Sequence, residues 1–369
     1  MRDRGARAGT IRRVAIGGLL SLVLVAPCAA HVSPGYSHDS TITTRHPDWM
    51  GALRDDVRLS QLSLPGTHDT MSFFGGDAVR TQTLSLPNQL ESGIRVLDIR
   101  CRHVRFGASS YRFAIVHGAT HQNAFFDDVL DAAVNFLKAH PRETVFMRVK
   151  EEGDPENIPP GRDFAMTFAQ YWDDARWQKV FWQPPPRNGG NPRLDQIRGK
   201  IVILRNFPVF SRDPAPPELY GIDYRSLQIQ DEFVMNSNWD LYDKWTKVLN
   251  HLRAADTGSQ NITYMNYLSA SRGSFPYFVA SGHSNPATGA PRLATGRTTP
   301  AFRNTWLDFP RVNCWRMFWT NFCTIAFEGT NILTYDRLPA FRRVGMIMAD
   351  FPGPGLIDRL VALNARFKR

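Results

Sequence analysis

Short runs of β-forming residues alternate with amphipathic stretches along most of this chain. Such alternation is typical of a parallel sheet whose strands are joined by helices. Strands are expected at 59–64, 95–100, 113–117, 144–150, 200–206, 226–230, 263–268 and 344–350. Eight is the number of strands that a closed (β/α) barrel needs. We therefore predict an α/β fold of the TIM-like (β/α)8 type.

The spacing of these elements predicts an irregular or incomplete barrel. Only about a dozen residues separate the strands expected at 95–100 and 113–117, which is too few for a normal crossover helix. Residues 269–343 are rich in Gly, Pro, Ser and aromatic residues and show little periodicity, so we expect a loop-rich insertion there. The clearest helices are expected at 125–139, 163–180, 239–253 and 356–367. Without an interior linker, residues 31–369 are expected to form a single domain.

The first 30 residues have the pattern of a signal peptide. Five arginines fall within the first 13 residues, an apolar run covers Val14–Ala26, and small residues precede His31. This pattern predicts export and cleavage before His31, so we expect a secreted protein. Two other interpretations stay open: Arg12-Arg13 could be a twin-arginine signal, and Cys28 could carry a lipid.

Charge and cysteine content agree with an extracellular protein that acts on an anionic partner. Of the net charge of +10, the signal segment carries +4, so the remainder is mildly basic. That charge favours a membrane surface or an acidic substrate. Nucleic acid is not expected, because no dense Lys/Arg cluster or groove-reading helix is evident. Cys314 and Cys323 could close a short disulfide, which would leave Cys101 free and buried.

Polar residues gather at the carboxyl ends of the expected strands, where TIM-type barrels carry their chemistry. They are His68-Asp69, Asp98, Arg100, His117, Lys150-Glu151-Glu152, Arg205, Asp231 and Asp350. A lone strand-end histidine is usually structural, so the prediction depends on His68, His117 and Arg100 together. Phosphodiester cleavage by an internal hydroxyl needs a base, an acid and a fixed cation. Two histidines and an arginine meet these needs without a metal.

Several segments resemble the X region of phosphatidylinositol-specific phospholipase C. They are SLPGTHDTMSF (63–73), NQLESGIRVLDIRCR (88–102), AIVHG (114–118), ETVFMRVKEE (143–152), RGKIVILRN (198–206), IQDEF (229–233) and ADFPGPGLI (349–357). The resemblance extends over roughly 55–367, with a gap at 269–343.

This resemblance implies a role for each matched residue. His68 would be the general base on the inositol 2-hydroxyl with Asp350 as its partner, and His117 would be the general acid on the diacylglycerol oxygen, supported by Asp69. Arg100 would bind the phosphate. The products would be diacylglycerol and inositol 1,2-cyclic phosphate, from phosphatidylinositol or a glycosylphosphatidylinositol anchor.

The resemblance also implies an inositol pocket. Lys150, Arg205 and Asp231 would line it, and Phe233 would stand where bacterial members often carry a tyrosine that stacks on the ring. Calcium-dependent members place carboxylates around the position of Arg100, and a guanidinium there would repel a divalent ion. The implied enzyme is therefore metal-independent and needs no cofactor.

Two alternative functions remain open at this point. One is a metal-dependent phosphodiesterase on the same fold, such as a glycerophosphodiesterase or a sphingomyelinase D. The other is a catalytically silent relative that binds lipid or glycan. We expect a monomer with peripheral membrane contact. The aromatic cluster Trp315, Phe318, Trp319 and Phe322 would either enter the lipid interface or pack as a cover over the barrel.

Overall fold

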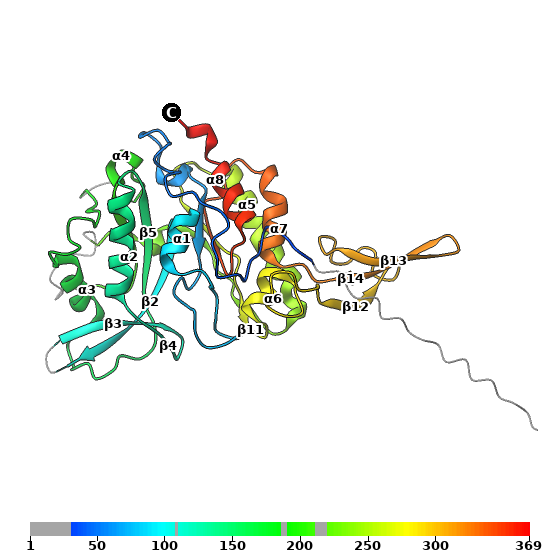
Figure 1. Cartoon of the computed structure of the whole chain (residues 1–369), viewed down its shortest axis with the longest axis horizontal. Coiled ribbons are helices and arrows are strands. Elements are labelled where there is room, and N and C mark those ends of the chain that lie inside the picture. The colour runs from blue at the N-terminus through cyan, green and yellow to red at the C-terminus, as the bar shows by residue number, and fades with distance from the viewer. Residues whose placement is uncertain (1–30, 108–109, 186–189, 211–219) are drawn as a thin grey trace, which may run out of the picture.

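A curved sheet of eight parallel strands forms the centre of the protein (Figure 1). The computed structural model describes residues 31–107, 110–185, 190–210 and 220–369. The strands lie in the order β7 (Ile222–Asp223), β6 (Lys200–Asn206), β5 (Thr144–Glu151), β2 (Val96–Phe106), β1 (Leu64–Thr67), β15 (Met346–Ala349), β10 (Tyr264–Tyr267) and β8 (Gln228–Gln230). Since β7 and β8 are the two ends of this sheet, the barrel is open between them. The expected incomplete TIM-like barrel is confirmed.

One predicted barrel strand has a different place. The strand expected at 113–117 is part of β3 (Ser110–His117), which pairs antiparallel with the long β2 and with β4 (Thr120–Phe125). An antiparallel neighbour needs only a tight turn, which explains the short connection after β2. The eighth barrel strand is instead β7, which has two residues and was too short to predict.

The first strand is also shifted from its expected position at 59–64. Leu59–Gln61 form a 3-10 helix, and β1 begins at Leu64 and continues through Pro65 and Gly66. Proline and glycine normally interrupt strands, so the sequence suggested an end where the strand in fact begins. Leu59, Leu62 and Leu64 pack into the barrel interior.

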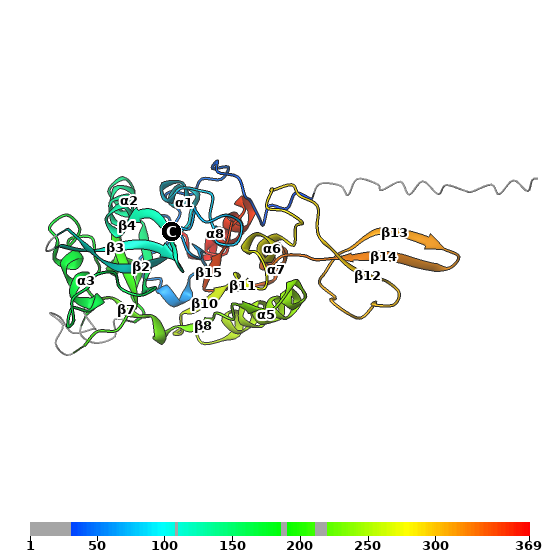
Figure 2. The same ribbon diagram turned by 90° about the horizontal axis from the view of Figure 1, so that it is seen from below.

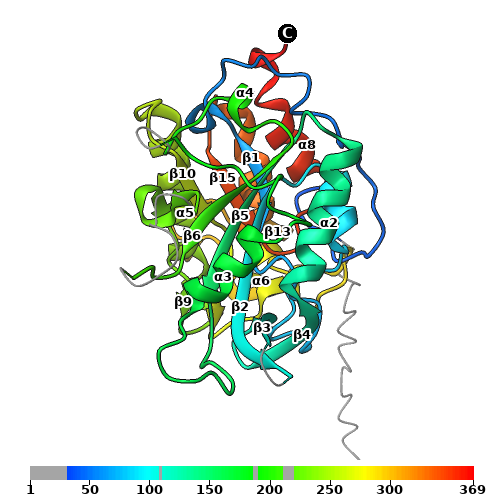
Figure 3. The ribbon, with the colours of Figure 1, turned by 90° about the vertical axis from the view of Figure 1, so that its left-hand side faces the viewer.

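Eight α-helices are described, and most of them pack on the outer face of the curved sheet. They are α1 (Leu86–Ser92), α2 (Phe126–Ala139), α3 (Phe164–Asp173), α4 (Leu194–Ile197), α5 (Leu241–Thr257), α6 (Pro276–Ser281), α7 (Thr330–Arg337) and α8 (Pro354–Ala362). Figure 3 shows α2 and α3 in front of the sheet. Helix α2 buries Val129, Ala133 and Leu137 at helical spacing and carries Asp127 and Asp128 in its first turn. Helix α3 ends earlier than expected, because the chain turns at Asp174.

The insertion at 269–343 is more ordered than its sequence suggested. It contains α6, α7 and an antiparallel sheet of β12 (Ala294–Thr298), β14 (Thr320–Ala326) and β13 (Arg311–Met317). Register shifts interrupt both pairings, and they obscure the two-residue periodicity of a strand. The Cys314–Cys323 disulfide is formed, and Cys101 is free and buried.

The signal peptide prediction, with Arg12-Arg13 and Cys28, lies outside the described residues. Within the described part of the chain, no helix has the length and apolar character needed to cross a membrane.

Candidate active site

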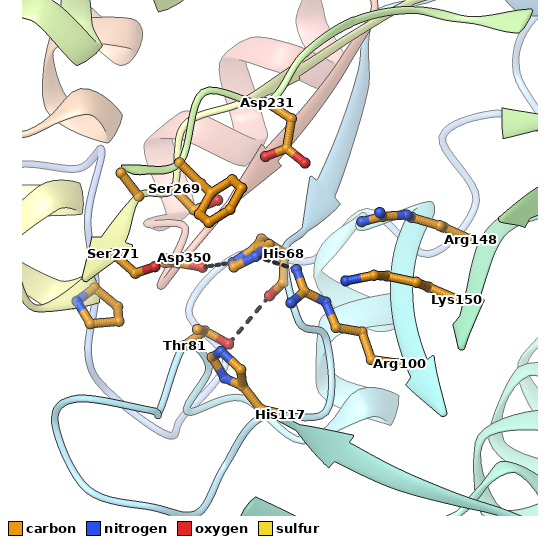
Figure 4. Close-up of a pocket in the computed structure, with 13 residues that line it drawn as sticks. His68, Thr81, Arg100, His117, Arg148, Lys150, Asp231, Ser269, Ser271 and Asp350 are labelled. Atoms are coloured by element: carbon orange, nitrogen blue, oxygen red, sulfur yellow. Dashed lines mark hydrogen bonds and ion pairs between the residues drawn. The ribbon is translucent and has the colours of Figure 1, made fainter. Parts of the chain in front are cut away.

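A pocket of about 180 Å³ opens at the carboxyl ends of the barrel strands (Figure 4). Seven of the nine predicted site residues line it: His68, Arg100, His117, Lys150, Asp231, Phe233 and Asp350. Asp69 lies buried beside them, in contact with both histidines and Arg100. Arg205 is not part of the lining.

The turn after β1 is held in an unusual backbone conformation. A Cβ on Gly66 would lie 2.8 Å from the Cβ of Val96, its partner in β2, so the close packing of β1 against β2 requires glycine. Asp69 has a φ of +40°, which is uncommon for a residue with a side chain. The Thr70 amide donates to the Asp98 carbonyl at 3.0 Å, and the Asp98 amide donates to the Thr70 hydroxyl at 2.8 Å. These bonds over-determine the turn, as is typical of strained functional positions.

His68 is arranged as a base. Its Nδ1 lies 2.7 Å from Oδ1 of Asp350, and its Nε2 lies 2.7 Å from Nη2 of Arg100. An arginine can only donate, so Nε2 must accept and Nδ1 must carry the hydrogen that Asp350 receives. Burial, aided by the Arg100 charge, holds the pKa of His68 well below its ordinary value. The ring is therefore neutral, and its unprotonated Nε2 accepts from Arg100, with Oδ2 of Asp69 3.3 Å away.

His117 is arranged to carry a proton on Nε2. The Ser72 hydroxyl donates to the Val79 carbonyl, so its oxygen accepts from Nδ1 of His117 at 3.0 Å. The other nitrogen, Nε2, lies 3.3 Å from Oδ2 of Asp69. An imidazolium would thus point its second N–H at a carboxylate. Burial and the Arg100 charge lower the pKa of His117 in the empty site; a bound phosphate anion would offset the second of these effects.

Arg100 is fixed by three carboxylates. Its Nε lies 2.7 Å from Asp69, its Nη1 lies 3.1 Å from Glu152, and its Nη2 lies 3.3 Å from Asp98. Glu152 also accepts from the Lys150 ammonium at 2.8 Å and from the Gly118 amide at 2.7 Å. Glu152 therefore links Arg100 and Lys150 to the turn that follows His117. The sequence showed Glu152 only as one of several strand-end acids.

Arg148 is a site residue that sequence reasoning missed. Its guanidinium donates from Nη1 to Asp98 Oδ1 at 3.1 Å and to the Tyr267 hydroxyl at 3.0 Å. With the Asn206 amide in its better orientation, the amide oxygen accepts from Nη2 and Nε of Arg148. Four of the five guanidinium hydrogens are thus used, which leaves one on Nη2. The two-residue period of a strand places Arg148 on the same side of β5 as Lys150, and this signal was available in the sequence.

Strand alternation also explains the position of Arg205. It pairs in register with Val149, whose side chain faces the helical layer. Arg205 therefore points away from the barrel interior, where it binds Asp223 at 2.9 Å and the Phe207 carbonyl at 3.2 Å. The interior position at this end of β6 belongs to Asn206. The expectation that Arg205 lines the inositol pocket is corrected by this geometry.

Asp231 and Phe233 follow β8 and line the pocket. Figure 4 shows Asp231 across the pocket from Arg100. Phe233 is 43% exposed, with the Arg272 guanidinium 5.5 Å from its ring. Ser269, Ala270, Ser271 and Pro276, from the start of the insertion, complete this side of the pocket.

The pocket has no arrangement of protein ligands typical of a metal centre. In the described ranges, no group of three or more His, Cys, Asp and Glu side chains is placed to hold an ion. Asp69, Asp98 and Glu152 do converge, but the Arg100 guanidinium lies among them.

Comparisons with known proteins agree with this geometry. The family model for the X domain of phosphatidylinositol-specific phospholipase C matches residues 67–207. The 1-phosphatidylinositol phosphodiesterase of Listeria monocytogenes is 31% identical over 264 residues, which cover 65% of this chain and 77% of that protein. The chain belongs to the phosphatidylinositol-specific phospholipase C family. The 1-phosphatidylinositol phosphodiesterase of Staphylococcus aureus is 26% identical over 316 residues, which cover 78% of this chain and 90% of that protein.

Solved structures of the family share the fold. The phosphatidylinositol-specific phospholipase C of Listeria monocytogenes superposes with a TM-score of 0.58 at 24% identity, covering 87% of this chain and 99% of that one. A Staphylococcus aureus phosphatidylinositol-specific phospholipase C, studied for its membrane binding, gives a TM-score of 0.60 at 22% identity, over 86% and 97% of the two chains. The family match at 67–207 includes both pocket histidines and Arg100.

Proposed function

We propose that this protein is a phospholipase C that cleaves phosphatidylinositol to diacylglycerol and inositol 1,2-cyclic phosphate. The observation that carries the proposal is the tautomer of His68: its unprotonated Nε2 faces a pocket that also holds His117 and Arg100. Membership of the phospholipase C family supports the same activity.

The chemistry follows from the two imidazoles. A bound phosphate accepts the Nη2 hydrogen of Arg100 in place of His68 Nε2. Nε2 of His68 then takes the proton of the inositol 2-hydroxyl, and the freed oxygen attacks phosphorus. The bond between phosphorus and the glycerol oxygen breaks, and His117 gives its Nε2 proton to that oxygen. Asp350 stabilises the His68 imidazolium, since it already accepts from Nδ1 at 2.7 Å.

Arg100 supplies the fixed positive charge for the phosphoryl oxygens. It is held by Asp69, Asp98 and Glu152, so little reorganisation is needed when charge develops in the transition state. A guanidinium in this position supports a metal-independent reaction. Lys150, Arg148 and Asp231 line the pocket, where they offer donors and an acceptor to the inositol hydroxyls. Figure 4 shows Lys150 next to Arg148.

We further propose that the enzyme works outside the cell, as a monomer that contacts membranes peripherally. The signal-like segment before His31 and the Cys314–Cys323 disulfide support export, because disulfides persist in oxidising compartments. The substrate is free phosphatidylinositol or a glycosylphosphatidylinositol anchor, and release of an anchored reporter enzyme from membranes would separate the two.

Phosphorus NMR of phosphatidylinositol vesicles in EDTA tests the reaction. We expect a cyclic inositol phosphate signal with the wild type, none with His68→Ala, and full activity with His140→Ala, a histidine that binds Asp48 away from the pocket. Turnover only after addition of calcium would favour the metal-dependent phosphodiesterase. Vesicle binding without turnover under either condition would favour the silent lipid-binding relative.

A further inference from the structure

The hairpin formed by β13 and β14 (Arg311–Ala326, called here the stapled hairpin) projects from the body of the protein. Figures 1 and 2 show it standing clear of the barrel from two directions. The Cys314–Cys323 disulfide joins its two strands. At its base, Arg311 donates to the carbonyls of Thr305, Trp306 and Phe309. The hairpin is thus fixed both to itself and to the insertion.

The end of the stapled hairpin exposes large apolar side chains. Phe318 is 85% exposed and Trp319 is 91% exposed, and both lie in the turn between the strands. Trp315 and Met317 just before the turn are about half exposed, at 50% and 52%. Single exposed apolar residues are common, but a contiguous group of this kind marks an interaction surface. The sequence-based alternative that this cluster packs as a cover over the barrel is not what the structure shows.

The two faces of the stapled hairpin differ in polarity. Trp315 pairs with Phe322 and stacks on it with ring centres 5.6 Å apart, and Met317 lies on the same face by strand alternation. The opposite face carries the paired Arg316 and Asn321. An element with an apolar tip, one apolar face and one cationic polar face matches the boundary between lipid head groups and acyl chains.

The surrounding sequence is positively charged. Residues 293–327 contain four arginines and a single acid, Asp308, which is already bonded to Arg337 and to the Trp245 indole. An anionic bilayer complements this charge, whereas a second copy of the same surface would repel it. The same insertion also supplies Ser269, Ser271 and Pro276 to the wall of the active-site pocket.

We propose that the stapled hairpin is a membrane anchor separate from the substrate pocket, which enters the head-group layer of an anionic bilayer through Phe318 and Trp319. The anchor fixes the protein to the surface on which a lipid substrate lies. The anchor only attaches the protein to the bilayer, and it binds vesicles that contain no inositol lipid. Its test is therefore independent of the proposed phospholipase activity.

Sedimentation with vesicles tests the anchor directly. The probes are vesicles of phosphatidylcholine alone and of phosphatidylcholine mixed with phosphatidylglycerol, neither of which contains inositol. We expect the double variant Phe318→Ser/Trp319→Ser to bind the mixed vesicles at least about tenfold more weakly than the wild type. Arg316→Gln should weaken binding to the mixed vesicles only. Leu307→Ser, which removes an apolar side chain that is 68% exposed but lies outside the hairpin, should bind like the wild type.

Three further readouts make the result decisive. Thermal unfolding and hydrolysis of monomeric short-chain phosphatidylinositol should be unchanged in the tip variant, which shows that its fold and pocket are intact. Lipids brominated in their acyl chains should quench the tryptophan fluorescence of the wild type more than that of Trp319→Phe. Wild-type vesicle binding by a correctly folded tip variant would overturn the proposal. A second outcome would also overturn it: the wild type self-associates, and the tip variant loses this self-association but still binds vesicles. The hairpin would then bind a second copy of the protein.

Discussion

The Lys244 ammonium donates to the backbone carbonyl of Glu232 at 2.8 Å from within helix α5. Lys244 is 3% exposed, and it also donates to the Gln230 side chain at 3.2 Å. The segment that it holds carries Asp231 and Phe233 into the pocket. A buried ammonium on the outer side of the loop thus fixes the wall that faces the substrate.

This contact predicts a binding defect when Lys244 is removed. Burial lowers the pKa of Lys244 to about 7, so Lys244→Met relieves a desolvation cost and should leave the fold intact. The loosened loop should raise KM about five- to tenfold with kcat within about twofold. Lys247→Met is the matched control, since Lys247 is exposed on the same helix and binds only the Glu232 carboxylate, at 3.3 Å. Equal KM values for the two variants would contradict the role of Lys244.

The positions of Arg148 and Arg205 predict opposite results for two similar substitutions. Arg148→Lys keeps the charge but loses the planar fork that binds Asp98, Tyr267 and Asn206, so kcat/KM should fall about tenfold or more. Arg205→Lys should leave kcat/KM unchanged, because this side chain faces away from the pocket. Steady-state kinetics on phosphatidylinositol vesicles compare them. A larger loss of kcat/KM for Arg205→Lys than for Arg148→Lys would show that the Arg205 side chain does not point outward in the active enzyme.

The electrostatics of the two histidines predict a shift between pH profiles. The general acid must be protonated, and burial with the Arg100 charge lowers the pKa of His117 in the free enzyme. Activity measured as kcat/KM should therefore begin to fall with rising pH below the ordinary histidine value of 6.5. Bound phosphate offsets the Arg100 charge and raises this pKa, so the fall in kcat should begin at higher pH.

The Ser72 hydroxyl provides a further check on that assignment. Its oxygen accepts from Nδ1 of His117, so Ser72→Ala should disfavour the imidazolium and move the falling limb of kcat/KM to still lower pH. If the pH profiles of kcat and kcat/KM of the wild type fall over the same pH range, the result would argue against His117 as the acid.

A buried ion pair outside the pocket predicts a stability effect. Arg95 and Glu143 are both fully buried and lie 2.8 Å apart, and Arg95 also donates to the carbonyls of Leu90 and Ile94. Arg95→Met leaves the Glu143 charge without its partner, so it should lower the free energy of unfolding by about 3–5 kcal/mol. Urea denaturation measures the change. Arg54→Met, at an exposed pair with Asp56, should cost less than about 1 kcal/mol.

The sequence was sufficient to predict the barrel, and most of the predicted site residues come together in one pocket, because both depend on local patterns. Strand-end polar residues such as His68 and Asp350 follow apolar runs directly, and the carboxyl ends of parallel strands meet at one rim. Arg205 was misplaced because a resemblance aligns positions along the chain without specifying the face of the strand. Arg148 was missed because a charged residue within an apolar run gave no indication of its partners, which come from β2, β6 and β10.

The insertion could not be predicted from periodicity. Bulged pairing and a positive φ at Asn313 hide its strands, and its tip has no core residues to mark it. The stapled hairpin is defined by the solvent exposure of its side chains, and that exposure depends on no other described segment packing against them. Such information is present in the three-dimensional structure and not in the order of the residues.

The left-handed turn at Asp69 has a consequence for how the catalytic groups can vary. One carboxylate touches His68, His117 and Arg100 at once, so their mutual spacing is set within a few residues of the end of β1. The three groups therefore cannot be repositioned one at a time. A change at Asp69 would disturb both histidines and the phosphate-binding arginine together.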